Sequence, residues 1–242
     1  PKPSSAVSDV YKRQVSTPYI ETNELRSARG LNNGENSGLY SEPDIDDATK
    51  LQWQNCNVIV SMDLPSDPRS LFPDLEWFQG VSAGYDHIDV KTAFQRGIIV
   101  TNTPSVLTTD TADMTMALLL AMPRKLREGH EEMQSGNWKG WNPPALMGTR
   151  VTGKNLGIIG MGRIGQAIAK RAIAFDLKIN YHNRRKLHSE LEKTLQAKYW
   201  INLEEMISHV DILVVSASLN PSSLYLLDQK MLSKLKPSAY II

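Results

Sequence analysis

One segment of the chain, residues 156–186 (LGIIGMGRIGQAIAKRAIAFDLKINYHNRRK), constrains the fold more than any other. A short apolar run leads into Gly160, Gly162 and Gly165, spaced as G-x-G-x-x-G, and then into an amphipathic helical pattern and a second apolar run. Such glycines permit a tight turn, a close backbone approach to a pyrophosphate and helix–strand packing, in that order. The segment therefore predicts a strand–turn–helix–strand unit whose helix, beginning near Arg163, binds a dinucleotide at its amino end. The alternative is that the glycines only make a tight turn.

The end of the second predicted strand bears on the choice of dinucleotide. In NAD sites an Asp or Glu stands there, roughly 20 residues after the glycines, and binds the ribose 2′-OH. Here Asn183 takes that place, and Arg184, Arg185 and Lys186 follow it. Guanidinium groups bind a 2′-phosphate through charge-assisted hydrogen bonds, whereas a carboxylate would repel it. We therefore predict NADP(H) as the preferred cofactor. NAD(H) is the alternative, if the arginines are only a solvated strand end.

Composition and charge argue against several other classes of protein. The chain has 242 residues and a net charge of +1, and we find no concentrated basic face of the kind that binds nucleic acid. Its longest apolar run, residues 116–122, is far shorter than the ~20 residues of a membrane-spanning helix. The single cysteine, Cys56, excludes an internal disulfide and a multi-cysteine metal site. We expect a cytoplasmic protein without a metal site.

Strand and helix patterns alternate along the rest of the chain, which predicts an α/β fold with parallel sheets. One long helix should begin with Asp110 or Thr111 as its cap and run to about Gln134, with a break at Pro123. Other helices are expected at 42–54, 88–97 (with Gly97 as stop signal), 203–210 and 228–236, and strands at 56–62 (buried), 75–84, 98–104, 211–219 and 239–242.

Two stretches, 155–172 (NLGIIGMGRIGQAIAKRA) and 81–121, together resemble the D-isomer-specific 2-hydroxyacid dehydrogenases, and most closely the glyoxylate/hydroxypyruvate reductase branch. The resemblance spans about residue 50 to residue 242. It implies two Rossmann-like domains, a flavodoxin-like substrate domain and an NAD(P)-binding Rossmann domain, with the active site between them. We expect both to be incomplete, with substrate-binding residues at 15–104 and dinucleotide-binding residues at 105–242. Residues 1–14 read as non-native sequence.

On the substrate side, the resemblance assigns Ser82, Ala83 and Gly84 to a turn whose backbone amides hold the substrate carboxylate. A plain strand-to-helix turn is the alternative. Trp138 and Trp141 match a tryptophan pair of this branch, in which one tryptophan reaches into the pocket of the partner subunit. Trp141 is the candidate for that role, and packing within a dimer interface is the alternative for both.

On the cofactor side, the resemblance assigns Thr111 to the neighbourhood of the nicotinamide, and a helix cap is the alternative or additional role. Arg163 and Ile164 match residues of the pyrophosphate loop. Ala217 and Ser218 match residues along the adenosine, after the third strand of the cofactor domain. Relatives commonly have Cys-Pro or a similar pair there, so contacts at this pair would come from the backbone.

The family's reaction is hydride transfer between a nicotinamide and a 2-oxo or 2-hydroxy carbon, assisted by an arginine, a glutamate and a histidine. We expect these three residues beyond Ile242, and none of the five histidines of this chain is expected to replace the catalytic one. The resemblance implies an enzyme that reduces small 2-oxo acids, and a homodimer formed through the helix after Thr111, although this stretch alone is expected to be inactive. A dinucleotide-sensing corepressor or an interaction protein on the same fold is the alternative.

Overall fold

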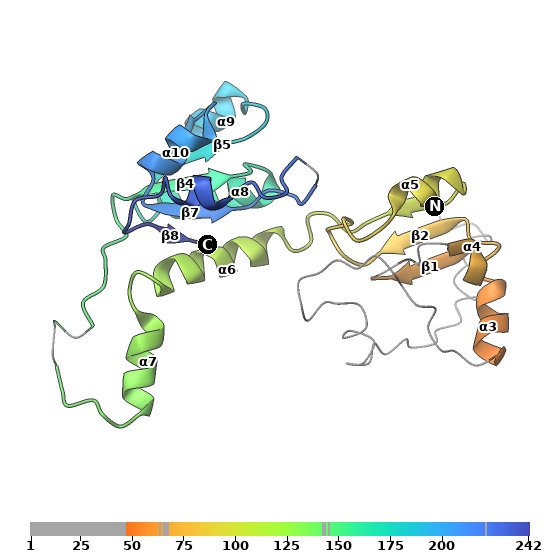
Figure 1. The fold of residues 1–242 in the computed structure, drawn as a ribbon, viewed down its shortest axis with the longest axis horizontal. Helices are drawn as coiled ribbons and strands as arrows, with labels where there is room; N and C mark the ends of the chain where they lie inside the picture. Colours follow the sequence, from red (N-terminus) through yellow and green to blue (C-terminus); the bar gives the residue numbers. More distant parts are fainter. Residues whose placement is uncertain (1–46, 63, 65–67, 142–143, 145, 221) are drawn as a thin grey trace, which may run out of the picture. The chain divides into compact units, whose positions relative to one another are not determined.

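The computed structural model describes residues 47–242 apart from 63, 65–67, 142–143, 145 and 221 (Figure 1). The chain divides into two compact units, Pro1–Thr103 and Pro104–Ile242, and each is described by itself. The interpretation of residues 1–14 as non-native sequence and the first residues of the helix expected at 42–54 lie outside the described part.

The first unit contains a three-stranded parallel sheet in the order β1-β2-β3. Its buried core is centred on Phe78 and Leu75, which are fully enclosed. The strand expected to be buried, β1, is only partly covered, because Val60 is 55% exposed. The elements are α3 (Asp47–Gln54), β1 (Val58–Ser61), α4 (Pro68–Leu71), β2 (Trp77–Gly80), α5 (Val90–Gln95) and β3 (Ile99–Thr101).

Helix α5 lies within the predicted range 88–97, begins at Val90 and, as predicted, stops before Gly97. The Asp89 side chain accepts a hydrogen bond from the Thr92 amide (2.9 Å), which satisfies one of the free amides of the first turn. Gly97 follows the helix with a φ of +73°, a left-handed conformation that glycine adopts without steric strain. The chain therefore turns directly from α5 into β3.

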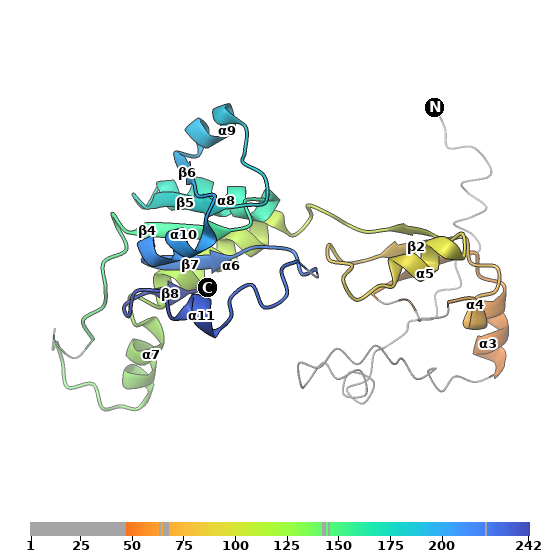
Figure 2. The same ribbon diagram turned by 45° about the horizontal axis from the view of Figure 1, so that its top comes forward.

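The second unit is built on a five-stranded parallel sheet in the order β6-β5-β4-β7-β8 (Figure 2). Numbered within this unit, the order is 3-2-1-4-5, the strand arrangement of a Rossmann fold. The prediction of an α/β fold with parallel sheets is thus confirmed. The elements are α6 (Thr108–Ala121), α7 (Leu126–Gln134), β4 (Asn155–Ile159), α8 (Arg163–Ile173), β5 (Lys178–His182), α9 (Ser189–Thr194), β6 (Ala197–Tyr199), α10 (Leu203–His209), β7 (Ile212–Val215), α11 (Gln229–Leu232) and β8 (Tyr240–Ile241).

Helices cover both faces of this sheet. Ile158 of β4 belongs to the apolar cluster that contains buried residues of α6 and α8, whereas its neighbour Ile159 belongs to the cluster formed with α10. Successive residues of a strand point to opposite faces, so both must be apolar when both faces are covered. This explains why the sequence of β4 is a continuous apolar run and not an alternating one.

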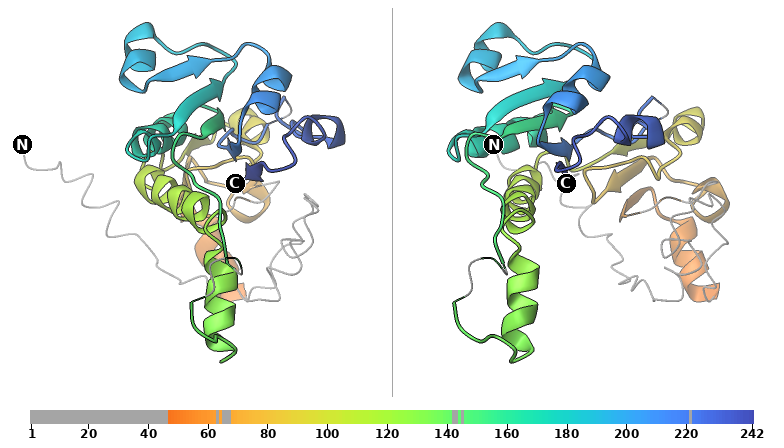
Figure 3. Two further views of the ribbon diagram at one scale, coloured as in Figure 1. Left: turned by 90° about the vertical axis from the view of Figure 1, so that its left-hand side faces the viewer. Right: turned by 60° about the vertical axis from the view of Figure 1, so that its left-hand side comes forward.

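Two predictions about the helical region after residue 107 have different outcomes. The break near Pro123 is confirmed, because α6 ends at Ala121 and α7 begins only after Lys125, whose φ is +52°. The predicted caps were wrong. Helix α6 begins at Thr108 and no side chain caps it, so Asp110 and Thr111 lie within its first turn. Helix α7 contains no buried residue and stands apart from the sheet (Figure 3).

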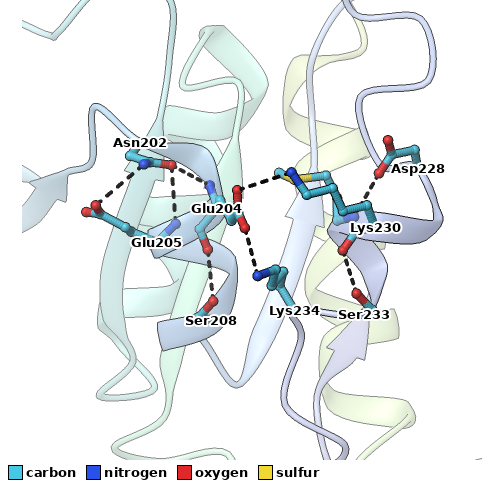
Figure 4. Close-up of polar contacts among 9 residues, drawn as sticks. Asn202, Glu204, Glu205, Ser208, Asp228, Lys230, Ser233 and Lys234 are labelled. Atoms are coloured by element: carbon cyan, nitrogen blue, oxygen red, sulfur yellow. Dashed lines mark hydrogen bonds and ion pairs between the residues drawn. The ribbon is translucent and has the colours of Figure 1, made fainter.

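Helices α10 and α11 are joined by ion pairs and each has a side-chain cap (Figure 4). The Asn202 Oδ1 accepts from the Glu204 amide (2.9 Å), and Glu204 in turn pairs with Lys234 (2.9 Å) and lies 4.0 Å from Lys230. These ion pairs are solvent-exposed and weak individually, so they orient α11 more than they stabilise the fold.

The enclosed position of Ile158 leads to a stability prediction. Ile158→Ala should lower the free energy of unfolding by about 2–5 kcal/mol, because it leaves a cavity in the central strand. Ile201→Ala, at a position that is 82% exposed, is the control and should change it by less than about 0.5 kcal/mol. Urea unfolding of both variants tests this, and equal effects would contradict the assigned packing.

Candidate dinucleotide site

The turn after β4 depends on a close approach between two backbones. Gly160 has a φ of +95°, and a Cβ added there would lie 2.6 Å from the Ser216 carbonyl oxygen and 2.7 Å from the Ala217 nitrogen. Neither backbone atom can move aside as a flexible side chain would. The first glycine of the motif is therefore required both by its conformation and by the lack of space.

The other two glycines of the motif have different surroundings. A Cβ on Gly165 would collide with the Gly160 carbonyl oxygen, so this glycine lets α8 pack against the turn. A Cβ on Gly162 would meet nothing within 4 Å. Gly162 is thus the one glycine of the three that the fold itself does not require. Its open position leaves room for a group that approaches the backbone at the amino end of α8.

The space beside Gly162 fits a pyrophosphate. The amides of Arg163 and Ile164 in the first turn of α8 have no acceptor within the helix, and the helix dipole favours a negative charge at this end. The site lies at the carboxyl ends of β4 and β7, where the strand order reverses, which is where ligands bind in open α/β sheets. Sequence reasoning did not single out Ser216, whose buried hydroxyl here has no hydrogen-bond partner among the described residues.

The basic cluster after β5 divides into two kinds of residue. Lys186 lies 3.3 Å from a carboxylate oxygen of Glu192, so its charge is already paired. Arg184 and Arg185 are exposed and form no ion pair within the described part of the chain. Asn183 is half-buried, and its carbonyl oxygen accepts from the Tyr199 hydroxyl (3.2 Å).

The remaining candidates on the cofactor side belong to the same unit. Thr111 is exposed in the first turn of α6, and its carbonyl accepts from the Thr115 hydroxyl (2.8 Å). Ala217 lies against the Gly160 turn, and Ser218 is exposed next to it. These two follow β7, which is the fourth strand of the unit along the chain and not the third, because the sequence reasoning missed β6.

The candidate substrate turn lies in the first unit, directly after β2. The Ser82 hydroxyl donates to the Gly84 carbonyl (2.6 Å), and the Asn102 side chain donates to the Ala83 carbonyl (2.8 Å). The Ala83 and Gly84 amides, by contrast, donate no hydrogen bond within the described residues. Asn102 was not identified from the sequence. It lies inside the strand predicted at 98–104, whereas β3 ends at Thr101 and leaves Asn102 in the loop that follows.

The two tryptophans lie on the surface of the single chain. Trp138 is 54% exposed and Trp141 is 90% exposed. Side chains of this size rarely remain in water unless another surface covers them. Their exposure agrees equally with a pocket of a second subunit and with a dimer interface.

The five-stranded sheet, the glycine turn and the open amino end of α8 together define a Rossmann-type dinucleotide-binding domain. The family described as "D-isomer specific 2-hydroxyacid dehydrogenase, NAD binding domain" matches residues 116–242, which is more than half of the chain. The chain belongs to this family. The resemblance noted in the sequence is thereby confirmed, and the bound cofactor class is a nicotinamide dinucleotide.

Individual relatives place the chain near the glyoxylate reductases. It is 41% identical to the glyoxylate reductase of Pyrococcus furiosus over 174 residues, which are 70% of this chain and 51% of that protein. Its identity to the Thermococcus litoralis enzyme is also 41%, over 70% of this chain and 52% of that protein. Among solved structures, a glyoxylate reductase from Paecilomyes thermophila matches with a TM-score of 0.70 and 32% identity, covering 80% of this chain and 60% of that one.

Among the described residues, no helix combines the length and the apolar composition that a transmembrane segment requires. No group of three or more His, Cys, Asp or Glu side chains within the same residues is arranged to hold a metal ion.

The contrast between Gly160 and Gly162 yields a prediction. Gly160→Ala should lower the free energy of unfolding by about 2 kcal/mol or more, because it combines a steric collision with an unfavourable φ. Gly162→Ala should leave stability nearly unchanged and weaken NADPH binding by about tenfold or more, because the methyl group occupies the space of the pyrophosphate.

Thermal unfolding and calorimetric titration of the two variants separate these effects. Unchanged NADPH affinity in Gly162→Ala would show that the pyrophosphate does not bind beside this residue.

Proposed function

We propose that this chain is part of an NADPH-dependent reductase that converts small 2-oxo acids, glyoxylate or hydroxypyruvate, into D-2-hydroxy acids. Membership of the 2-hydroxyacid dehydrogenase family and the similarity to glyoxylate reductases support this activity. The matched residues span about half the length of the curated relatives. The substrate, the preference for NADPH and the oligomeric state are therefore parts of the proposal.

The observation that carries the cofactor preference is that two exposed arginines just after β5 form no ion pair with any described residue. Arg184 and Arg185 follow the strand at the place where an acidic residue would bind the ribose hydroxyls of NAD. Asn183 brings no negative charge to this place. Because Lys186 is held by Glu192, the two guanidinium groups are the cations of this loop that remain for a 2′-phosphate.

Substrate recognition is assigned to the turn after β2. Two adjacent amides, those of Ala83 and Gly84, suit the two oxygens of a carboxylate, and the bond from Asn102 fixes the turn. Backbone amides recognise any small 2-oxo carboxylate, so this turn explains the substrate class and not the choice within it. The nicotinamide, when bound, supplies the hydride.

We assign no catalytic acid within this chain. The His87 Nε2 lies 2.7 Å from the Met62 carbonyl oxygen, and the His182 Nδ1 lies 3.0 Å from that of Trp200. Both rings are therefore held by backbone carbonyls and serve local structure.

A homodimer through α6 and α7 is part of the proposal. Within the described residues, the large apolar side chains of α7 are more than half exposed, and α6 exposes further apolar residues. A second copy of the chain would bury them and would also cover the tryptophans. The exposed apolar residues of the two helices are Met114 (62%), Leu118 (45%), Leu126 (66%) and Met133 (59%).

The proposed preference predicts a selective loss of NADPH binding. Arg184→Ala and Arg185→Ala should each weaken NADPH binding by about tenfold, because each removes a charge-assisted hydrogen bond, and should change NADH binding by less than about twofold. Lys178→Ala, at the opposite end of the same strand, is the control and should affect neither cofactor.

Fluorescence titration with both cofactors tests the preference, and turnover of glyoxylate and hydroxypyruvate by the complete protein tests the activity. Equal loss of NADH and NADPH binding would contradict the assignment of the arginines. NADPH binding without turnover of either acid would contradict the reductase and favour the corepressor alternative.

A further inference from the structure

The loop that carries the two arginines is held at both ends by tyrosine hydroxyl groups. At its start, the Tyr199 hydroxyl donates to the Asn183 carbonyl oxygen (3.2 Å). At its end, the Leu187 amide donates to the Tyr181 hydroxyl (2.9 Å). The two rings come from neighbouring strands, β6 and β5, and their centroids lie 5.3 Å apart. Residues 183–187 are therefore fixed to the sheet at two points.

The Tyr181 hydroxyl has a second partner that makes this arrangement rigid. Tyr181 is completely buried, and its hydroxyl donates to the Glu192 Oε1 (2.6 Å). Burial and this hydrogen bond raise the pKa of Tyr181 above its ordinary value, so the phenol stays protonated. The same hydrogen bond, followed by the one from Lys186, lowers the pKa of Glu192, so the carboxylate stays charged.

Glu192 in turn fixes the third basic residue of the loop. Its side chain is only 14% exposed, and its second oxygen pairs with the Lys186 ammonium group (3.3 Å). Lys186 is thereby turned toward α9. Arg184 and Arg185 lie between the two tyrosine contacts and stay exposed. Lys186 is thus paired with a carboxylate of its own domain, whereas Arg184 and Arg185 form no ion pair with any described residue.

We propose that Tyr181 and Tyr199 are positioning residues for cofactor discrimination, which hold the 183–187 loop in the conformation that presents Arg184 and Arg185 to a 2′-phosphate. This inference rests on the NADP(H) preference proposed above. A loop that is already ordered loses less conformational entropy when it binds, so its hydrogen bonds contribute more to affinity. The two tyrosine hydroxyl groups would then strengthen phosphate binding only by ordering the loop, without contacting the phosphate themselves.

The test separates these hydroxyl groups from the packing of their rings. Tyr181→Phe and Tyr199→Phe keep the aromatic rings and remove one loop anchor each. Tyr240→Phe is the matched control. Tyr240 belongs to β8, the edge strand opposite β6, and its hydroxyl lies 3.3 Å from the Thr149 hydroxyl. The probes are adenosine 2′,5′-bisphosphate and AMP, which differ by the 2′-phosphate alone. Their dissociation constants are measured by calorimetry on the whole chain.

We expect Tyr181→Phe and Tyr199→Phe each to weaken bisphosphate binding by about three- to tenfold, with AMP binding unchanged. In the same variants the Leu187 amide, or its neighbours in the loop, should exchange with solvent deuterium faster. Tyr240→Phe should show neither change. Retained bisphosphate affinity in both loop variants, with a loss in Arg184→Ala, would overturn the positioning role and leave the cofactor proposal intact.

Failure of the cofactor proposal gives a different result. If the unsubstituted chain binds adenosine 2′,5′-bisphosphate no more tightly than AMP, the arginines do not read a 2′-phosphate, and the positioning role falls with them. If a tyrosine variant loses affinity for both probes equally, the hydroxyl serves the general structure of the domain, which also overturns the inference.

Discussion

The contact between the Gly160 turn and the backbone of Ser216 and Ala217 is the constraint on which the second unit depends. It brings the carboxyl ends of β4 and β7 together at the point where the strand order reverses. Gly165 then packs α8 against the same turn, and this places the amino end of the helix beside Gly162. The proposed pyrophosphate site is therefore a consequence of backbone packing, and no side chain of the motif is needed to form it.

Recognition of the dinucleotide is divided between backbone and side chains. In the proposed site, the turn and the amino end of α8 face the pyrophosphate, which NAD and NADP share, so they would not distinguish the two cofactors. We propose that the loop after β5 discriminates between the two cofactors, because Arg184 and Arg185 lie there between its two anchored ends. One of these anchors is the buried Tyr181, so in this proposal cofactor specificity depends on a residue of the core as well as on the surface.

Local sequence patterns predicted the structure correctly where neighbouring residues in the sequence determine it. The glycine spacing identified the turn, and the apolar run before it identified the strand β4. The reasoning missed α9 and β6, since β6 has only three residues (AKY) and exists through pairing with β5. The Asp110 cap was wrong because α6 starts one turn earlier without any side-chain cap. The side chains of Asn102, Tyr181 and Tyr199 contact backbone groups 19, 6 and 16 residues away, and such contacts follow no helix or strand period.

Amide chemical-shift mapping of the isotopically labelled chain during titration with NADPH tests the central claim most directly. The account predicts shifts at the glycine turn and the first turn of α8, in the 183–187 loop, and at Ser216 and Ala217. The amino ends of β4, β5 and β6, at the opposite edge of the sheet, should remain unchanged. Shifts concentrated at those amino ends, or unchanged signals from Gly162 and Arg184 at saturating NADPH, would contradict it.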